Sequence, residues 1–124
     1  MTNSKIQNYA VGVDLGGTFV KAALVSEIGN IIFKDELPIG SEASKNTILD
    51  TIEKIIARAL DKADEKNLKV IGIGLGTPGI VYEGVIFGGA DNLNGWENID
   101  LAEHFSKAFN LPVRVDNDAN LMGL

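Results

Sequence analysis

The chain has 124 residues, of which 45% are hydrophobic and 23% are charged, and its mean hydropathy is +0.11. This is the composition of an ordinary globular domain with a single hydrophobic core. Asp and Glu together number 17 against 11 Lys and Arg, a balance that argues against nucleic acid or an anionic membrane as the main partner. The lack of cysteine excludes disulfides and Cys-ligated zinc within these residues. Since no signal peptide or membrane span can be recognised, we expect a cytoplasmic protein.

The first 26 residues predict a lead-in followed by a β-hairpin. Residues 1–8 are polar and are expected to be flexible. An apolar run then leads to Asp14, breaks at Gly16-Gly17, and resumes with β-branched and aromatic residues after Thr18. The spacing at this turn fits neither the dinucleotide fingerprint nor the P-loop. The stretch therefore predicts two strands joined by a tight turn.

The residue types at this turn suit a phosphate. Gly16 and Gly17 allow a ligand to approach the backbone closely, and backbone N–H groups at such a turn form an anion-binding concavity. Thr18 adds a hydroxyl and Lys21 an ammonium. A carboxylate at Asp14 makes sense if Mg²⁺, held through water, lies between it and the phosphate. The alternative is an ordinary Gly-Gly hairpin with solvated charges.

The next segments predict a layered α/β architecture. Residues 31–39 indicate a third strand that closes a meander, and apolar residues at helical spacing over 48–63 predict an amphipathic helix with Ser44 or Asn46 as N-cap. Residues 68–75 predict a strand buried on both faces. Strand, helix and strand in this order imply a right-handed crossover.

Residues 74–79 contain a literal G-x-G-x-x-G directly after this strand, so a nicotinamide cofactor has to be weighed. A dinucleotide fold requires a helix at this point. Residues 80–87 instead predict a β-hairpin that turns at Glu83-Gly84. The motif therefore argues only weakly for a dinucleotide site.

Residues 88–98 form a loop rich in Gly and Asn, too polar for the core. The amides of Asn92 and Asn94 both donate and accept hydrogen bonds, which suits sugar hydroxyls. Trp96 either covers a sugar ring or anchors the loop. The alternative is a loop with no ligand, because Asn and Gly are common in turns.

The last part of the chain predicts a short helix, a strand and a candidate catalytic carboxylate. Asp100 opens a capping box for a helix that runs through Phe109, and residues 113–116 predict a strand. Asp118 follows this strand, where α/β folds place catalytic groups, although a helix N-cap explains it equally well. His104, the only histidine, is expected to be structural or exposed.

Three motifs resemble those of a known family. The stretch V-G-V-D-L-G-G-T-F-V-K resembles the first phosphate motif of the superfamily of sugar kinases, actin and heat-shock chaperone ATPases, and in particular of the ROK family of bacterial sugar kinases and related repressors. V-D-N-D-A-N and G-G-A-D-N-L-N-G-W resemble the catalytic motif and the sugar loop of that family. The resemblance runs from about residue 9 to residue 124. It implies an actin/hexokinase-type, ribonuclease H-like domain, in which an antiparallel β-meander is followed by βαβ units in a mixed sheet.

The resemblance also implies roles for single residues. Asp118 would be the general base that accepts the proton of the sugar hydroxyl. The sugar-contacting positions fall on Gly79, Gly89, Asn92, Asn117 and Asp118. The hairpin residues Asp14, Gly16, Gly17, Thr18 and Lys21 would hold the phosphates of ATP, with Asp14 bound to Mg²⁺ through water.

On this basis the sequence predicts ATP-dependent phosphorylation of a hexose, as in a glucokinase. The resemblance covers only the amino-terminal half of a family member, so we expect residues 9–124 to form the amino-terminal lobe, without the carboxy-terminal lobe. The isolated chain is then expected to be nearly inactive, and the intact protein to be a homodimer. Polyphosphate is an alternative donor. Two alternative functions are a sugar-sensing module without turnover and an actin-like ATPase.

Overall fold

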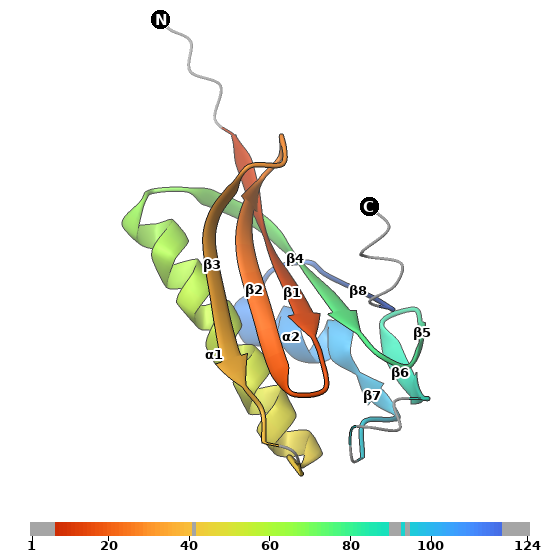
Figure 1. The fold of residues 1–124 in the computed structure, drawn as a ribbon. Helices are drawn as coiled ribbons and strands as arrows, with labels where there is room; N and C mark the ends of the chain where they lie inside the picture. The colour runs from red at the N-terminus through yellow and green to blue at the C-terminus, as the bar shows by residue number, and fades with distance from the viewer. Residues whose placement is uncertain (1–6, 41, 90–92, 94, 118–124) are drawn as a thin grey trace, which may run out of the picture.

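The structure, a computed structural model, describes residues 7–40, 42–89, 93 and 95–117 of the chain (Figure 1). A five-stranded mixed sheet has the order β3-β2-β1-β4-β8, and a smaller sheet has the order β5-β6-β7. Strands β1 to β3 form an antiparallel meander, and β4 and β8 run parallel to β1. The elements in chain order are β1 (Asn8–Leu15), β2 (Phe19–Ser26), β3 (Ile31–Pro38), α1 (Lys45–Glu65), β4 (Lys69–Thr77), β5 (Ile80–Tyr82), β6 (Val85–Gly88), β7 (Ile99–Asp100), α2 (Leu101–Phe109) and β8 (Val113–Asn117). The predicted α/β class and meander are confirmed.

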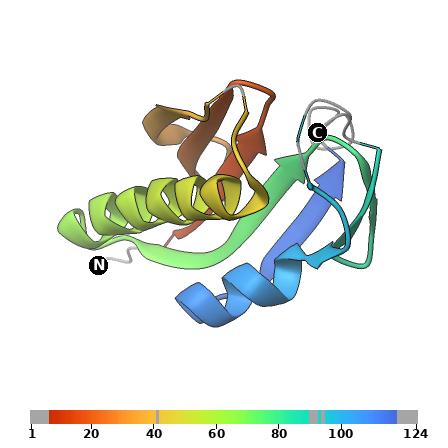
Figure 2. The ribbon, with the colours of Figure 1, turned by 90° about the horizontal axis from the view of Figure 1, so that it is seen from below.

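Helices α1 and α2 lie on the same side of the five-stranded sheet (Figure 2). Helix α1 packs on the strands from β3 to β4, and α2 packs on β8 and β6. Between the sheet and the helices lies the core, which includes the register-matched row Val13, Leu75 and Val115. We call the opposite side of the sheet the open face, because neither helix covers it.

Helix α1 forms as its sequence predicts. Ser44 is the N-cap, and its Oγ accepts a hydrogen bond of 3.2 Å from the backbone N–H of Thr47. The helix ends next to Asn67, which adopts the left-handed conformation with φ of 57°. Its buried stripe consists of residues at three- and four-residue spacing: Ile48, Leu49, Ile52, Ile55, Ile56, Ala59 and Ala63.

The expectation that residues 68–75 are buried on both faces was wrong for the described part of the chain. In β4, Ile73 and Leu75 are buried against the helices, while Gly72 and Gly74 lie half-buried on the open face. Ile71 is 47% exposed. The apolar run looked like a doubly covered strand because its open-face positions are glycines, which count as apolar but bury no side chain.

The small sheet is tied to the amino terminus of α2. Its hairpin turns at Glu83-Gly84 as predicted, with φ of 49° and 84°. The Gly84 carbonyl accepts hydrogen bonds from the N–H groups of Leu101 and Ala102, at 3.0 and 3.2 Å. Asp100 caps the same helix by accepting from the N–H of Glu103 at 3.0 Å, which confirms the predicted helix start.

Neither helix among the described residues is both long and apolar enough to span a bilayer.

Candidate functional site

The predicted hairpin is present between β1 and β2. The Gly16 N–H donates to the Phe19 carbonyl at 2.9 Å, and a Cβ on Gly16 would lie only 3.3 Å from that oxygen. On the other side of the turn, the Thr18 carbonyl accepts from the N–H of Ile39 at 2.9 Å, which holds the turn against the end of β3. The Thr18 residue itself is exposed. Backbone hydrogen bonds therefore hold both ends of the turn, while Thr18 is exposed to solvent.

A row of charged residues crosses the open face next to this turn. Asp14 in β1 pairs in register with Lys21 in β2 and with Gly76 in β4. Beyond these, Lys21 pairs with Glu36 in β3, and Gly76 pairs with Asp116 in β8. Because paired residues share a face of the sheet, these side chains all belong to the open face. Carboxylates and one ammonium thus meet where the phosphate motif ends.

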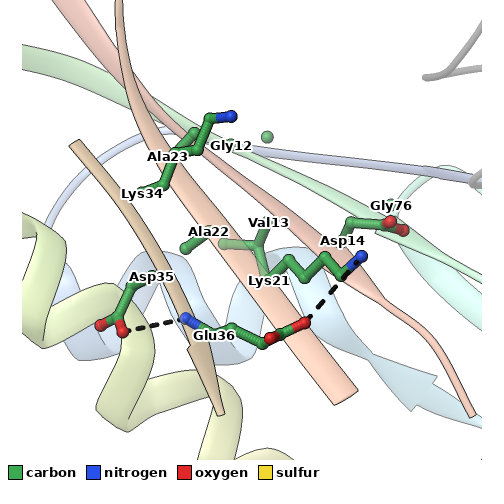
Figure 3. A pocket seen from close by; sticks show the side chains of 11 residues that line it. Gly12, Val13, Asp14, Lys21, Ala22, Ala23, Lys34, Asp35, Glu36 and Gly76 are labelled. Carbon is green, nitrogen blue, oxygen red and sulfur yellow. Dashed lines mark hydrogen bonds and ion pairs between the residues drawn. The ribbon is translucent and has the colours of Figure 1, made fainter. Parts of the chain in front are cut away.

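The row borders a hollow of about 800 Å³ on the open face (Figure 3). Its floor includes Gly12, Ala23 and Gly74, which are register neighbours on three adjacent strands. In Figure 3 the Lys21 side chain extends toward Asp14. Small floor residues leave the space that a ligand or another segment requires, and the adjacent charges suit a Mg²⁺-bound polyphosphate.

The carboxyl ends of the parallel strands β1, β4 and β8 lie at one edge of the sheet. The predicted phosphate-binding residues and the predicted sugar-binding residues Gly79 and Asn117 are therefore at the same edge. Thr77 at the end of β4 pairs with Asn117 at the end of β8. The Asn117 amide, through Nδ2, donates a hydrogen bond of 2.7 Å to the Gly79 carbonyl. Two of the residues that the resemblance assigns to the sugar are therefore in direct contact, although 38 positions separate them in the sequence.

Gly79 and Gly89 directly precede and directly follow the β5–β6 hairpin of the small sheet. Ile80 pairs with Gly88 in the antiparallel β5–β6 hairpin, so Gly79 and Gly89 flank the two members of this pair along the chain. Both have positive φ, of 107° and 84°, which favours glycine. The two remaining site predictions, Asn92 and Asp118, lie outside the described residues.

The sequence left open whether Trp96 covers a sugar ring or anchors the loop, and it gave no signal for Thr77, the partner of its indole. Trp96 is only 2% exposed, and its Nε1 donates a hydrogen bond of 2.8 Å to Oγ1 of Thr77, which is fully buried. Thr77 in turn donates to the Pro78 carbonyl at 3.0 Å. Of the two interpretations of the indole, anchoring of the loop is the one that the geometry bears out. The loop also contributes Leu93 to the core, so the expectation that it is too polar for burial was wrong there.

The donor set fits a loosely held magnesium ion. Among the described residues, no group of three or more His, Asp or Glu side chains could form an all-protein metal site. Mg²⁺ in phosphoryl-transfer sites keeps several waters and binds one or two carboxylates together with phosphate oxygens. Asp14, exposed at the strand end, fits that role. His104 is exposed and makes an edge contact with the Phe105 ring at 4.8 Å, in line with a structural or surface role.

A second hollow, of about 540 Å³, lies between the start of α1 and α2. The Lys107 ammonium on its rim pairs with Glu103 at 2.9 Å. The hydrogen bond to Glu103 raises the pKa of Lys107. None of the predicted site residues lines this hollow, so the open face and its carboxyl edge are the better candidate site.

Comparisons with known proteins agree with the motifs. The model of the ROK family matches residues 10–124. A glucokinase of Halalkalibacterium halodurans is 36% identical over 116 residues, which are 92% of this chain and 34% of that protein. A xylose repressor of Caldicellulosiruptor bescii is 32% identical over 112 residues, 89% of this chain and 28% of the repressor. The chain thus spans about a third of the length of these curated relatives.

Solved structures confirm the predicted actin/hexokinase-type fold. A ROK family glucokinase from Streptomyces griseus, in complex with glucose and AMPPNP, superimposes with a TM-score of 0.73 at 30% identity, covering 90% of this chain and 34% of that one. An inorganic polyphosphate/ATP-glucomannokinase from Arthrobacter sp. strain KM superimposes with a TM-score of 0.79 at 23% identity, covering 94% and 46%, and at that identity it speaks for the fold alone. The motifs, the family match and the topology agree: the chain belongs to the ROK family.

Proposed function

We propose that this chain forms the amino-terminal lobe of an ATP-dependent hexose kinase resembling glucokinase. The observation that carries the proposal is the parallel register of β1, β4 and β8, which gathers Asp14, Gly79 and Asn117 at one edge of the sheet. A phosphate motif and a sugar motif at one edge are what transfer between two substrates requires. The similarity to a glucokinase over 92% of the chain supports the same conclusion.

The donor half of the site is the hairpin. Gly16 lets the backbone approach the phosphates of ATP closely, while its own N–H stays bonded to the Phe19 carbonyl. The Gly17 N–H, the Thr18 hydroxyl and the Lys21 ammonium bind the phosphates, and Asp14 would hold Mg²⁺ through water. The metal, when bound, neutralises phosphate charge. The AMPPNP in the Streptomyces griseus glucokinase supports ATP as the donor. Polyphosphate, which the Arthrobacter enzyme's name includes, is the second donor to test.

The acceptor half of the site lies at the ends of β4 and β8. Gly79, Gly89, Asn92 and Asn117 orient the sugar, and the hydrogen bond from Asn117 to Gly79 keeps two of them together. Asp118 accepts the proton of the sugar hydroxyl as its oxygen attacks the terminal phosphoryl group of the donor. Catalysis then consists mainly of positioning and charge stabilisation, as in other phosphoryl transfers.

The decisive experiment is Asp118→Asn in a protein that includes the remaining two thirds found in the relatives. We expect kcat to fall by roughly 10²–10⁴-fold, the usual contribution of a general base, while the Kd for the sugar changes little. Asp61→Asn, on the exposed side of α1, is the matched control and should retain full activity. Undiminished turnover in Asp118→Asn would contradict the proposal. The 124-residue chain alone should phosphorylate hexoses hardly at all, since the closure that excludes water needs a second lobe.

A second candidate is a sugar-binding regulator without turnover, which the similarity to xylose repressors favours. Such a protein would bind a sugar through the same edge but would not need a base. It would show no ATP-dependent phosphorylation in the wild type, and Asp118→Asn would leave its response to sugar intact. A coupled kinase assay together with sugar-binding calorimetry separates the two functions.

A further inference from the structure

The ammonium of Lys21 lies between two carboxylates on the open face. In the sheet register, Lys21 stands directly opposite Asp14 on one side and Glu36 on the other. Its Nζ is 3.9 Å from Oε2 of Glu36, too long for a hydrogen bond, while the side chain extends toward Asp14 (Figure 3). The Lys21 and Glu36 side chains are 65% and 51% exposed. Lys21 is therefore attracted by Glu36 without being fixed by it.

Typical interaction energies indicate how easily Lys21 can exchange Glu36 for a phosphate. Exposed ion pairs at such a separation contribute little to stability. A polyphosphate offers Lys21 several negative charges and stronger, charge-assisted hydrogen bonds, so it can displace Glu36. Adjacent strands lie about 4.8 Å apart, which puts Glu36 roughly 10 Å from Asp14 across the sheet. That is within about one Debye length at 0.1 M salt, so the charge of Glu36 also repels a polyanion bound there.

We infer that Glu36 is a positioning residue for Lys21: it competes with the phosphoryl donor for the ammonium and thereby lowers the affinity of the hairpin for polyphosphate anions. The inference rests on the proposed function in one respect, namely that the hairpin is the donor site. It adds a residue outside the phosphate motif, on a different strand, that weakens donor binding. Both the competition and the repulsion predict the same sign of effect.

The test compares Glu36→Gln with the wild type in the same two-lobe protein. We expect the Kd for inorganic tripolyphosphate with Mg²⁺, measured by calorimetry, and the KM for ATP to fall about two- to fivefold, the range of an exposed charge interaction. The change in kcat should be smaller than the change in KM, because Glu36 does not touch the reacting atoms. The gain should shrink as KCl is raised.

Two controls test whether the tighter binding in Glu36→Gln is local and acts through Lys21. Asp50→Asn removes the same charge from the exposed side of α1, across the sheet, and should leave both constants unchanged. In a Lys21→Met background, Glu36→Gln should tighten tripolyphosphate binding less than it does in the wild type, because the competition has been removed. Equal gains in the two backgrounds would overturn the role of Lys21, and so would weaker or unchanged binding in Glu36→Gln.

The inference and the proposed function can fail separately. Tighter tripolyphosphate binding in Glu36→Gln, in a protein that phosphorylates no hexose, would support the competition and contradict the kinase. Hexose phosphorylation with an unaltered KM for ATP in Glu36→Gln would support the kinase and overturn the competition. Failure of every variant to bind either tripolyphosphate or ATP would overturn both.

Discussion

The two faces of the five-stranded sheet are made by the same strands but differ in their side chains. Toward the helices, β1 presents Val11, Val13 and Leu15, all buried. On the open face the same strand presents Gly12 between Ala10 and Asp14, and its neighbours at Gly12 are Ala23 and Gly74. Branched apolar side chains fill the space under a helix, whereas glycine and alanine leave the sheet surface bare.

The two faces are therefore expected to have different roles, with the helix side stabilising the fold and the open face binding ligands. Alternation along a strand lets one residue build the core while the next one lines the hollow and the charged row. Substitutions on the helix side should therefore act on folding. Those on the open face should act on ligands, with little effect on folding.

The largest effect on stability is expected from Ile52→Ala. Ile52 is fully buried in the stripe of α1 that covers the sheet. Removing its side chain leaves a cavity, at a cost of about 2–5 kcal/mol in the free energy of unfolding. Val25→Ala, at a half-buried open-face position, is the control and should cost less than about 1 kcal/mol. Urea denaturation measures both, and equal losses would contradict the contrast between the faces.

An intermediate effect is expected from Gly84→Ala, which tests how the small sheet is joined to α2. A Cβ at Gly84 would lie 2.6 Å from the Cβ of Ala102, and φ there is 84°. Overpacking and backbone strain together should cost about 2–4 kcal/mol.

Gly29→Ala separates these two causes. Gly29 has a similar φ of 92°, but no atom of the described residues lies within 4 Å of its added Cβ. It should therefore show the strain alone, about 1 kcal/mol. If the two variants unfold at the same urea concentration, the close approach of the hairpin to α2 is not what makes Gly84 necessary.

The smallest effect, and one of opposite sign, is expected from Gly74→Ala on the open face. Within the described part of the chain, no atom lies within 4 Å of a Cβ added at Gly74. Alanine suits a strand better than glycine, so stability should rise by about 0.5 kcal/mol. Thermal unfolding is the measurement, and Gly12→Ala should behave alike for the same reason. A marked loss instead would mean that this face is packed against another segment.

The fold was predictable where the signal is local. The helical spacing in α1, the caps Ser44 and Asp100, and the Gly-Gly turn each depend on residues close in sequence, and all are present. Which face of β4 is covered was not predictable, because it depends on where distant helices pack. The apolar content of β4 alone suggested burial on both sides.

The site was predictable in part for the same reason. The hairpin with Asp14 and Lys21 is one continuous motif, so sequence alone pointed to it. The contact between Asn117 and Gly79, the tie between Trp96 and Thr77, and the pairing of Lys21 with Glu36 depend on strand register. Strand register is set by the whole sheet and cannot be read from a local motif. Of these three contacts, only the one between Asn117 and Gly79 joins residues that the family resemblance had assigned to the same site.

The hydrogen bond between Trp96 and Thr77 has a practical consequence. Trp96 is the only tryptophan in the chain, and its buried indole is joined to a residue two positions before Gly79. Indole fluorescence responds to burial and hydrogen bonding, so this chain carries a built-in optical reporter beside the candidate sugar site. Titration with hexoses can thus be followed without any added label, and a spectral shift would originate from one known position.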